Sequence, residues 1–96
     1  MELLRHGIDV NAIDNVGNTA LHNAVIHNNA TTVCKLLYFG ANIDASNHEK
    51  RTALHIATLA INPTLVSILL QHKANVDAID SVGATSLHYI AAHRSI

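Results

Sequence analysis

The sequence predicts an all-α repeat solenoid, in which short helical units stack along one axis. The phrase Thr-Ala-Leu-His occupies residues 19–22 and 52–55, and Thr-Ser-Leu-His occupies residues 85–88, so the offset is 33 residues both times. An Asp-x-x-Gly turn sequence lies just before the first and third phrases, at residues 14–17 and 80–83. A constant offset of this size is typical of stacked supersecondary units rather than of one folded-back domain.

Residues 1–12 match the end of a unit whose first helix is absent. Leu3–Leu4 would close a second helix, and Gly7 would supply the left-handed residue that ends it. A hairpin segment begins there and recurs after the next two units, within residues 40–45 and 73–78. We therefore expect a partial unit at this end.

Residues 13–45 carry the signals of a complete unit. Thr19 can cap a helix over residues 20–27, because its hydroxyl accepts a hydrogen bond from a backbone N–H of the first turn. Asn29 can cap a second helix over residues 30–38, whose apolar residues recur at three- and four-residue spacing. The unit is predicted to be two helices followed by a hairpin.

Residues 46–78 form a second complete unit that departs from the pattern at its turns. Lys50 and Lys73 stand where the neighbouring units have glycine. A non-glycine residue with positive φ costs on the order of 1 kcal/mol, so strained or reshaped turns are expected. Asn62 as a cap and Pro63 at the first helical position still predict a second helix.

Residues 79–96 contain a turn and one helix, with Leu87, Ile90 and Ala91 on the predicted inner face. Repeat units do not bury their apolar faces alone, and arrays normally carry capping repeats. We interpret the array as open at both ends. One interpretation is a segment of a longer array or the product of a truncated reading frame. The alternative is that a partner or a dimer contact covers an end. The residues predicted to lack an outer neighbour are Leu4, Ile8, Leu87 and Ile90.

Composition excludes several functional classes. A net charge of −1 with neutral histidines leaves no basic footprint for nucleic acid. Cys34 is the one cysteine, which excludes an internal disulfide and a cysteine-rich zinc site. No apolar run approaches membrane-spanning length, and the N-terminal residues lack the apolar core of a signal peptide. An intracellular, cytoplasmic location is therefore the expectation.

The period, the Thr-x-Leu-His phrase, the turn and the hairpin segment together resemble the ankyrin repeat over almost the whole chain. The resemblance implies one array of helix-turn-helix units with β-hairpin-like loops. Its units are a partial repeat (1–12), two repeats (13–45 and 46–78) and a partial repeat (79–96). The implied function is a non-catalytic protein–protein interaction module, a scaffold or adaptor, with further ankyrin repeats as candidate neighbours. The alternative is a structural spacer, or a truncated fragment of a larger ankyrin-repeat protein with no binding role of its own.

Eight histidines raise the question of a metal site. By the resemblance, His22, His55 and His88 hydrogen-bond the phrase threonines and neighbouring backbone, and so tie repeat to repeat. His27 and His93 occupy one repeat position two units apart, which is about 20 Å if stacked helices lie about 8–10 Å apart. Zinc–nitrogen bonds are only about 2 Å long. We expect no metal and no cofactor.

Catalysis is not expected either. Cys34 maps to the outward face of a second helix, and Lys35 is its neighbour in sequence but not on the same face. Asp14 and Asp80 recur at the repeat period as turn residues, which indicates a structural role. The sequence also lacks a glycine-rich phosphate loop and a Gly-x-Ser-x-Gly turn.

The binding surface of ankyrin arrays resembles a cupped hand, with hairpin tips as fingers and first helices as palm. Tip residues differ from unit to unit here, which frees them from scaffold duty and makes them available for recognition. Apolar groups on the palm would form the desolvated centre, and charged groups would lie at the rim. The predicted partner-binding residues are Asn15, Val16, Asn18, Ile26, His27, Phe39, His48, Glu49, Arg51, Leu59, His72, Ser81, Val82 and His93.

A modification site is also predicted by resemblance. The run Leu3, Asp9, Val10, Asn11 is similar to the recognition pattern of the asparaginyl hydroxylase that modifies ankyrin arrays, with Asn11 as the candidate target. The favoured alternative is that Asn11 closes its own hairpin by side-chain hydrogen bonds.

Overall fold

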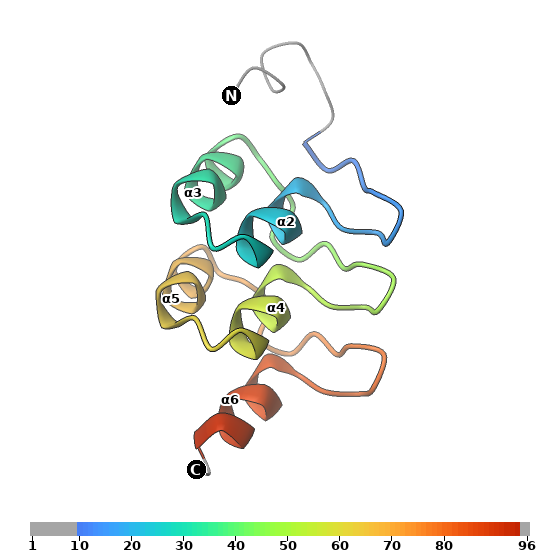
Figure 1. Cartoon of the computed structure of the whole chain (residues 1–96), viewed down its shortest axis with the longest axis vertical. Helices are drawn as coiled ribbons and strands as arrows, with labels where there is room; N and C mark the ends of the chain where they lie inside the picture. The colour runs from blue at the N-terminus through green and yellow to red at the C-terminus, as the bar shows by residue number, and fades with distance from the viewer. Residues whose placement is uncertain (1–9, 95–96) are drawn as a thin grey trace.

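A computed structural model describes residues 10–94 of the chain, and over this range the secondary structure is entirely helical. The helices form two columns beside a row of extended hairpin loops (Figure 1). The first column holds the first helices of three units and the second column holds two second helices. The helices are α2 (Ala20–Ile26), α3 (Ala30–Tyr38), α4 (Ala53–Leu59), α5 (Pro63–Gln71) and α6 (Ser86–Arg94). The predicted all-α repeat solenoid is confirmed.

Each first helix begins at the threonine of the repeated phrase. The Thr19 hydroxyl accepts from the His22 backbone N–H, and His22 Nδ1 accepts from the Thr19 backbone N–H at 2.9 Å. This reciprocal capping box satisfies two N–H groups that a helix start would otherwise leave unpaired. The same bonds form at Thr52 with His55 and at Thr85 with His88.

The second helices begin at the predicted asparagines. Asn29 Oδ1 accepts from the Thr32 N–H at 3.1 Å, and Asn62 Oδ1 accepts from the Leu65 N–H at 3.2 Å. Pro63 occupies the first helical position, where its missing N–H costs nothing. Both predicted caps are confirmed, and α3 covers the predicted range of 30–38.

The turns of the unit at residues 46–78 keep the glycine conformation without glycine. Lys50 has φ of 60° and Lys73 has φ of 66°, close to the φ of 81° at Gly17. Ile61, between α4 and α5, is also left-handed, with φ of 53°. The turns are therefore strained rather than reshaped, because an L side chain at positive φ crowds its own backbone.

Glycine at either lysine is expected to stabilise the chain. Lys50→Gly and Lys73→Gly should each raise the free energy of unfolding by up to about 1 kcal/mol, by relieving positive φ. Equilibrium urea denaturation measures the change. Lys35→Gly, inside α3, is the control and should destabilise, because glycine weakens a helix interior. A denaturation midpoint that falls in both turn variants would contradict the strain.

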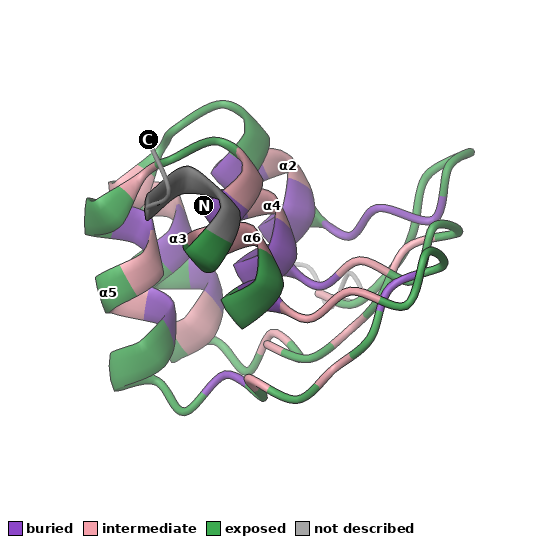
Figure 2. Cartoon of the chain, turned by 90° about the horizontal axis from the view of Figure 1, so that it is seen from below, coloured by how far each residue is buried: buried purple, intermediate pink, exposed green. Residues whose placement is uncertain are grey.

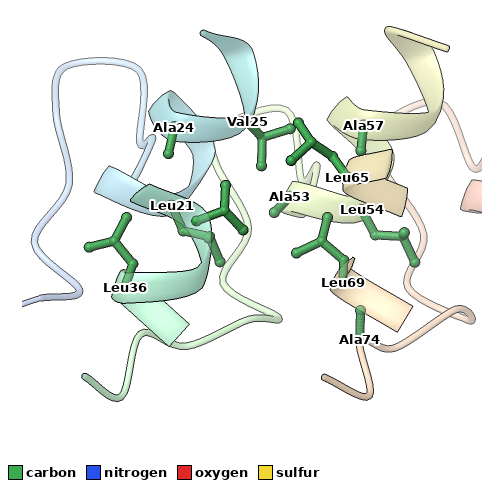
Figure 3. Packing of buried hydrophobic residues seen from close by; sticks show 11 residues of the cluster. Leu21, Ala24, Val25, Leu36, Ala53, Leu54, Ala57, Leu65, Leu69 and Ala74 are labelled. Carbon is green, nitrogen blue, oxygen red and sulfur yellow. The ribbon is translucent and has the colours of Figure 1, made fainter. Parts of the chain in front are cut away.

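The core lies between the two helix columns. Leu21 and Val25 of α2, Leu36 of α3, Leu54 of α4 and Leu69 of α5 are buried in one apolar cluster (Figure 3). In a view along the stack, buried positions lie on the facing sides of the columns, and the hairpin tips are largely exposed (Figure 2). Fully burying one leucine side chain contributes about 1.5–3 kcal/mol, so these contacts dominate the stability of each unit.

The apolar residues of α5 and α6 differ in how far they are buried. Leu65 and Leu69 of α5 are fully buried, but Leu70 is 44% exposed. In α6, Leu87 is 57% exposed and Ala91 is also exposed, because α6 has no second helix beside it in the described part of the chain. This agrees with the prediction that Leu87 lacks an outer neighbour, while Ile90 is partly buried. The other two residues predicted to lack an outer neighbour, Leu4 and Ile8, lie outside the described range.

Candidate functional site

The hairpin tips share one backbone geometry despite different sequences. Asp14 Oδ1 accepts from the backbone N–H groups of Val16 (3.0 Å) and Asn18 (2.9 Å). Asn47 and Asp80 accept from the matching N–H groups of their own tips. The carbonyl oxygen, which Asn and Asp both carry, is what the turn requires. The two residues at each tip centre therefore remain free to vary.

Backbone hydrogen bonds place neighbouring tips side by side. The His48 N–H donates to the Val16 carbonyl at 3.1 Å, and the Ser81 N–H donates to the Glu49 carbonyl at 2.9 Å. This contact aligns positions 16, 49 and 82 along one row of loops (Figure 1). Val16 and Val82 are both well exposed in this row, at either side of the charged Glu49.

The histidines of the repeated phrase brace one unit against the next. His22 Nε2 lies 2.9 Å from the Arg51 carbonyl, and His55 Nε2 lies 3.1 Å from the Ala84 carbonyl. The Thr19 N–H can only donate, so His22 Nδ1 accepts and Nε2 carries the proton that is donated to Arg51. Burial lowers the pKa of His22, although its hydrogen bond to Arg51 acts the other way. The structural role predicted for this histidine is confirmed.

The buried carboxylate of Asp80 contacts Arg51 of the preceding unit. The Tyr89 hydroxyl donates to Asp80 Oδ2, and Arg51 Nε lies 3.6 Å from the same oxygen. Burial of Asp80 opposes ionisation, but bonds from Tyr89, Ala84 and Val82 outweigh it and lower its pKa to about 2. Asp80 is therefore an anion at neutral pH and faces the Arg51 guanidinium across the unit boundary.

Sequence reasoning missed the role of Tyr89. One signal lay in the sequence, since Tyr89 follows Asp80 by nine residues, as Asn23 follows Asp14. Asn23 Nδ2 donates to Asp14 Oδ2 at 3.4 Å, which is the weaker counterpart of the tyrosine bond. The polar side chain in the second turn of a first helix thus supports the preceding turn.

Two of the predicted binding residues have structural contacts. Asn18 is only 9% exposed, and its Oδ1 accepts from Asn47 Nδ2 at 2.9 Å. Arg51 is partly buried beside Asp80, and its carbonyl accepts the bond from His22. The assumption that positions 18 and 51 are free of scaffold duty is therefore wrong. Both remain at the base of the tips rather than at their exposed ends.

The remaining predicted residues lie at the ends of the helices or at exposed loop positions. Ile26 ends α2 and Leu59 ends α4; Ile26 is half-exposed and Leu59 is partly buried. Phe39 caps the end of α3 and makes an edge-to-face contact with Tyr38, with ring centroids 5.3 Å apart. The side chain of His93, in α6, lies outside what the structure describes. The other predicted residues that are exposed are Asn15, His27, His48, Glu49, His72 and Ser81.

The Asn11 side chain forms a hydrogen bond to the next hairpin. Its Oδ1 accepts from the Asn42 N–H at 2.7 Å. Asp44 makes the same contact with the Asn75 N–H at 2.8 Å, so the position has a periodic inter-hairpin role. Closure of its own hairpin by Asn11 and hydroxylation of Asn11 both stay predictions.

Residues 10–94 were also searched for a metal-binding cluster. No cluster of three or more His, Cys, Asp or Glu side chains there could hold a metal ion. Cys34 is an exposed free thiol on α3. Among the described helices, none is both long and apolar enough to cross a membrane.

Comparison with known proteins agrees with the repeat architecture. A family model described as ankyrin repeats (3 copies) matches residues 25–96, and a second, described as ankyrin repeats (many copies), matches residues 1–37. No curated protein matches the chain.

Proposed function

Because the chain belongs to the ankyrin-repeat family, whose members are generally non-catalytic protein–protein interaction modules, we propose that it binds a protein partner through its hairpin tips and first helices. The proposed surface, called the tip-and-palm surface below, has a row of tips as one wall. Its palm residues are Ile26, His27 and Leu59. Stacked repeats offer an elongated concave face of this kind for recognition.

One observation carries the proposal: apolar side chains stay exposed at the tips while the supporting contacts are saturated. Val16 is 57% exposed and Val82 is 75% exposed, although the turn groups beneath them are hydrogen-bonded. An apolar side chain at a loop tip adds nothing to this core. Its burial against a partner would remove apolar area from water, which favours association.

The palm would supply the centre of the contact. Ile26 is 50% exposed at the end of α2, and Leu59 is partly buried at the same position of α4. Apolar groups that become fully desolvated usually carry most of the binding free energy. Glu49 and Arg51, paired at 3.4 Å, lie at the rim and would mainly affect the association rate and its salt dependence.

Loss of these palm side chains is expected to abolish partner capture. The test pair is Ile26→Ser with Leu59→Ser, against Cys34→Ser with Lys35→Ser on α3, which lies in the other helix column. Partner capture from lysate, followed by mass spectrometry, should be lost with the first pair and kept with the second. A circular dichroism melt of each variant controls for folding, because Leu59 is partly buried.

The opposite result would assign binding to the other face. If the palm variants keep the captured partner and the α3 variants lose it, the tip-and-palm surface is not the site. If no version of the chain captures a protein, the spacer alternative is favoured.

A further inference from the structure

Neighbouring units in this chain are joined by two kinds of hydrogen bond that repeat in register. In one, the Nε2–H of a phrase histidine donates to a carbonyl 29 residues later. In the other, a tip N–H donates to the carbonyl of the preceding tip. Each contact occurs twice within the described residues. The observed pairs are His22–Arg51 and His55–Ala84 for the first contact, and His48–Val16 and Ser81–Glu49 for the second.

The C-terminal edge, defined by Val82, Leu87 and His88, carries the donor and the acceptor of a third such junction. His88 Nδ1 accepts from the Thr85 N–H at 3.0 Å, so its Nε2 carries the proton, as in His22. Within residues 10–94 no hydrogen bond forms to that Nε2 or to the Val82 carbonyl. Both groups point to a junction that the described chain does not complete.

The same edge leaves an apolar side chain in water. Leu87 is 57% exposed, whereas Leu21 and Leu54, at the same position of the phrase, are 2% and 1% exposed. Covering Leu87 would remove apolar area from water, which favours association.

The N-terminal edge, defined by Asn15, Asn18 and Ala20, carries the complementary groups. Asn15 stands where His48 and Ser81 stand in the later tips, and its N–H bonds no other described residue. The Asn18 carbonyl already accepts from the Asp14 N–H at 2.9 Å. It has a second lone pair, which is the one that the matching Arg51 carbonyl uses for His22.

The helix that belongs to this edge is also uncovered. Ala20, the first residue of α2, is exposed, whereas Ala53 and Ser86 at the same position are each 1% exposed, because a preceding unit packs against them. Within residues 10–94, the N-terminal edge thus has no preceding unit of the kind that packs against α4 and α6.

We propose that the chain self-associates head to tail, with the C-terminal edge of one copy seated on the N-terminal edge of a second copy. His88 Nε2 then donates to the partner's Asn18 carbonyl, and the partner's Asn15 N–H donates to the Val82 carbonyl. The partner's α2 packs against α6, as α4 packs against α2 and α6 packs against α4 within the chain. The register of these bonds is the one already seen twice within the chain, and a second copy is the occupant because its N-terminal edge supplies both complementary groups, the Asn15 N–H and the Asn18 carbonyl.

The net charge permits this association, and the difference between the two edges determines its symmetry. A net charge of −1 gives little repulsion between copies. The two edges are different surfaces, so the contact is heterologous and does not close on itself. Dimers form first, and longer stacks form as the protein concentration rises.

Sedimentation equilibrium of the purified chain over a wide concentration range, with a reducing agent present for Cys34, tests the proposal. The weight-average mass should rise with concentration above the 10.3 kDa of one chain. Leu87→Lys blocks the C-terminal edge, and Ala20→Lys blocks the N-terminal edge. Each variant alone should stay monomeric, with self-association weakened by about tenfold or more, and Cys34→Lys on α3 should associate like the wild-type chain.

Mixing the two edge variants distinguishes a head-to-tail contact from any other. Leu87→Lys keeps a free N-terminal edge and Ala20→Lys keeps a free C-terminal edge, so an equimolar mixture should form dimers and nothing larger. A wild-type chain that stays at 10.3 kDa throughout, or a mixture of folded variants that stays monomeric, overturns the proposal. So does association of either variant alone to the wild-type extent.

A second pair of variants is used if Leu87→Lys or Ala20→Lys fails to fold, which circular dichroism melts would reveal. Asn15→Pro removes the free N–H at a turn position where proline fits, and Val82→Lys adds charge at the exposed C-terminal tip. The same mixing result is expected from this pair, and its absence counts equally against the proposal. Partner capture is measured on Leu87→Lys and Ala20→Lys, neither of which is a tip-and-palm residue, so it is a readout separate from self-association.

Discussion

Replacement of His22 by alanine is expected to lower the free energy of unfolding by about 2–4 kcal/mol. His22 is 1% exposed, and alanine would leave a cavity in place of the ring. The Thr19 N–H would lose its acceptor, and the Arg51 carbonyl would lose the donor that joins the two units. Urea denaturation followed by circular dichroism measures the loss, which is large against the marginal stability of a chain of this size.

His88→Ala is the matched control, because His88 makes the same bonds within its own unit but is exposed. It should cost only about 1 kcal/mol, the usual effect of losing one helix-cap contact. Equal losses for the two variants would show that the inter-unit bond and the burial of His22 contribute nothing.

A pH series separates the histidine contribution further. The folded-state pKa of His22 is lowered by burial, so the unfolded chain binds the proton more readily than the folded chain. The contribution is fully present above the ordinary histidine pKa of about 6.5 and is lost as the pH falls below it. The wild-type chain should therefore lose more stability than His22→Ala between about pH 7.5 and pH 5.5.

Gly17→Ala is expected to be the second most damaging single change, at about 2–4 kcal/mol. Gly17 has φ of 81°, so any side chain is strained there by about 1 kcal/mol. A Cβ at Gly17 would also lie 2.8 Å from the backbone nitrogen of His48 and 2.5 Å from its ring. The backbone has to shift, and that shift weakens the bond from the His48 N–H to the Val16 carbonyl.

Gly83→Ala isolates the strain from the clash. Gly83 has the same φ of 81°, but a Cβ there meets nothing within 4 Å. Thermal or urea unfolding should show a loss of about 1 kcal/mol for Gly83→Ala and a clearly larger loss for Gly17→Ala. If the two glycines tolerate alanine equally well, close packing of neighbouring tips does not contribute to stability.

Local signals were enough to predict the helices. The threonine and asparagine caps act within three residues of themselves, so Thr19, Asn29 and Asn62 could be identified without a partner in space. The left-handed turns at Lys50 and Lys73 followed from the repeat register, because the matching glycines mark where the chain must turn.

The candidate surface was predictable only in part. Exposed tips such as Val16 and Val82 followed from variation between units. Asn18 and Arg51 vary in the same way, yet they contact Asn47 and Asp80 across unit boundaries. Variation shows that a position does not require one residue type, and it does not show that the position is unoccupied.

The sequence by itself determined the helix starts, which depend on residues within one unit, and the repeat length and the family, which follow from short motifs that recur along the chain. The tertiary structure decided which polar groups are shared between units, including the buried Asp80 with Tyr89 and Arg51. It also decided which apolar side chains stay in water, such as Leu87 against the buried Leu21. The physical reason is that burial and hydrogen-bond pairing in a stack depend on the neighbouring unit, about 30 residues away, whereas caps and turns depend on the adjacent peptide groups.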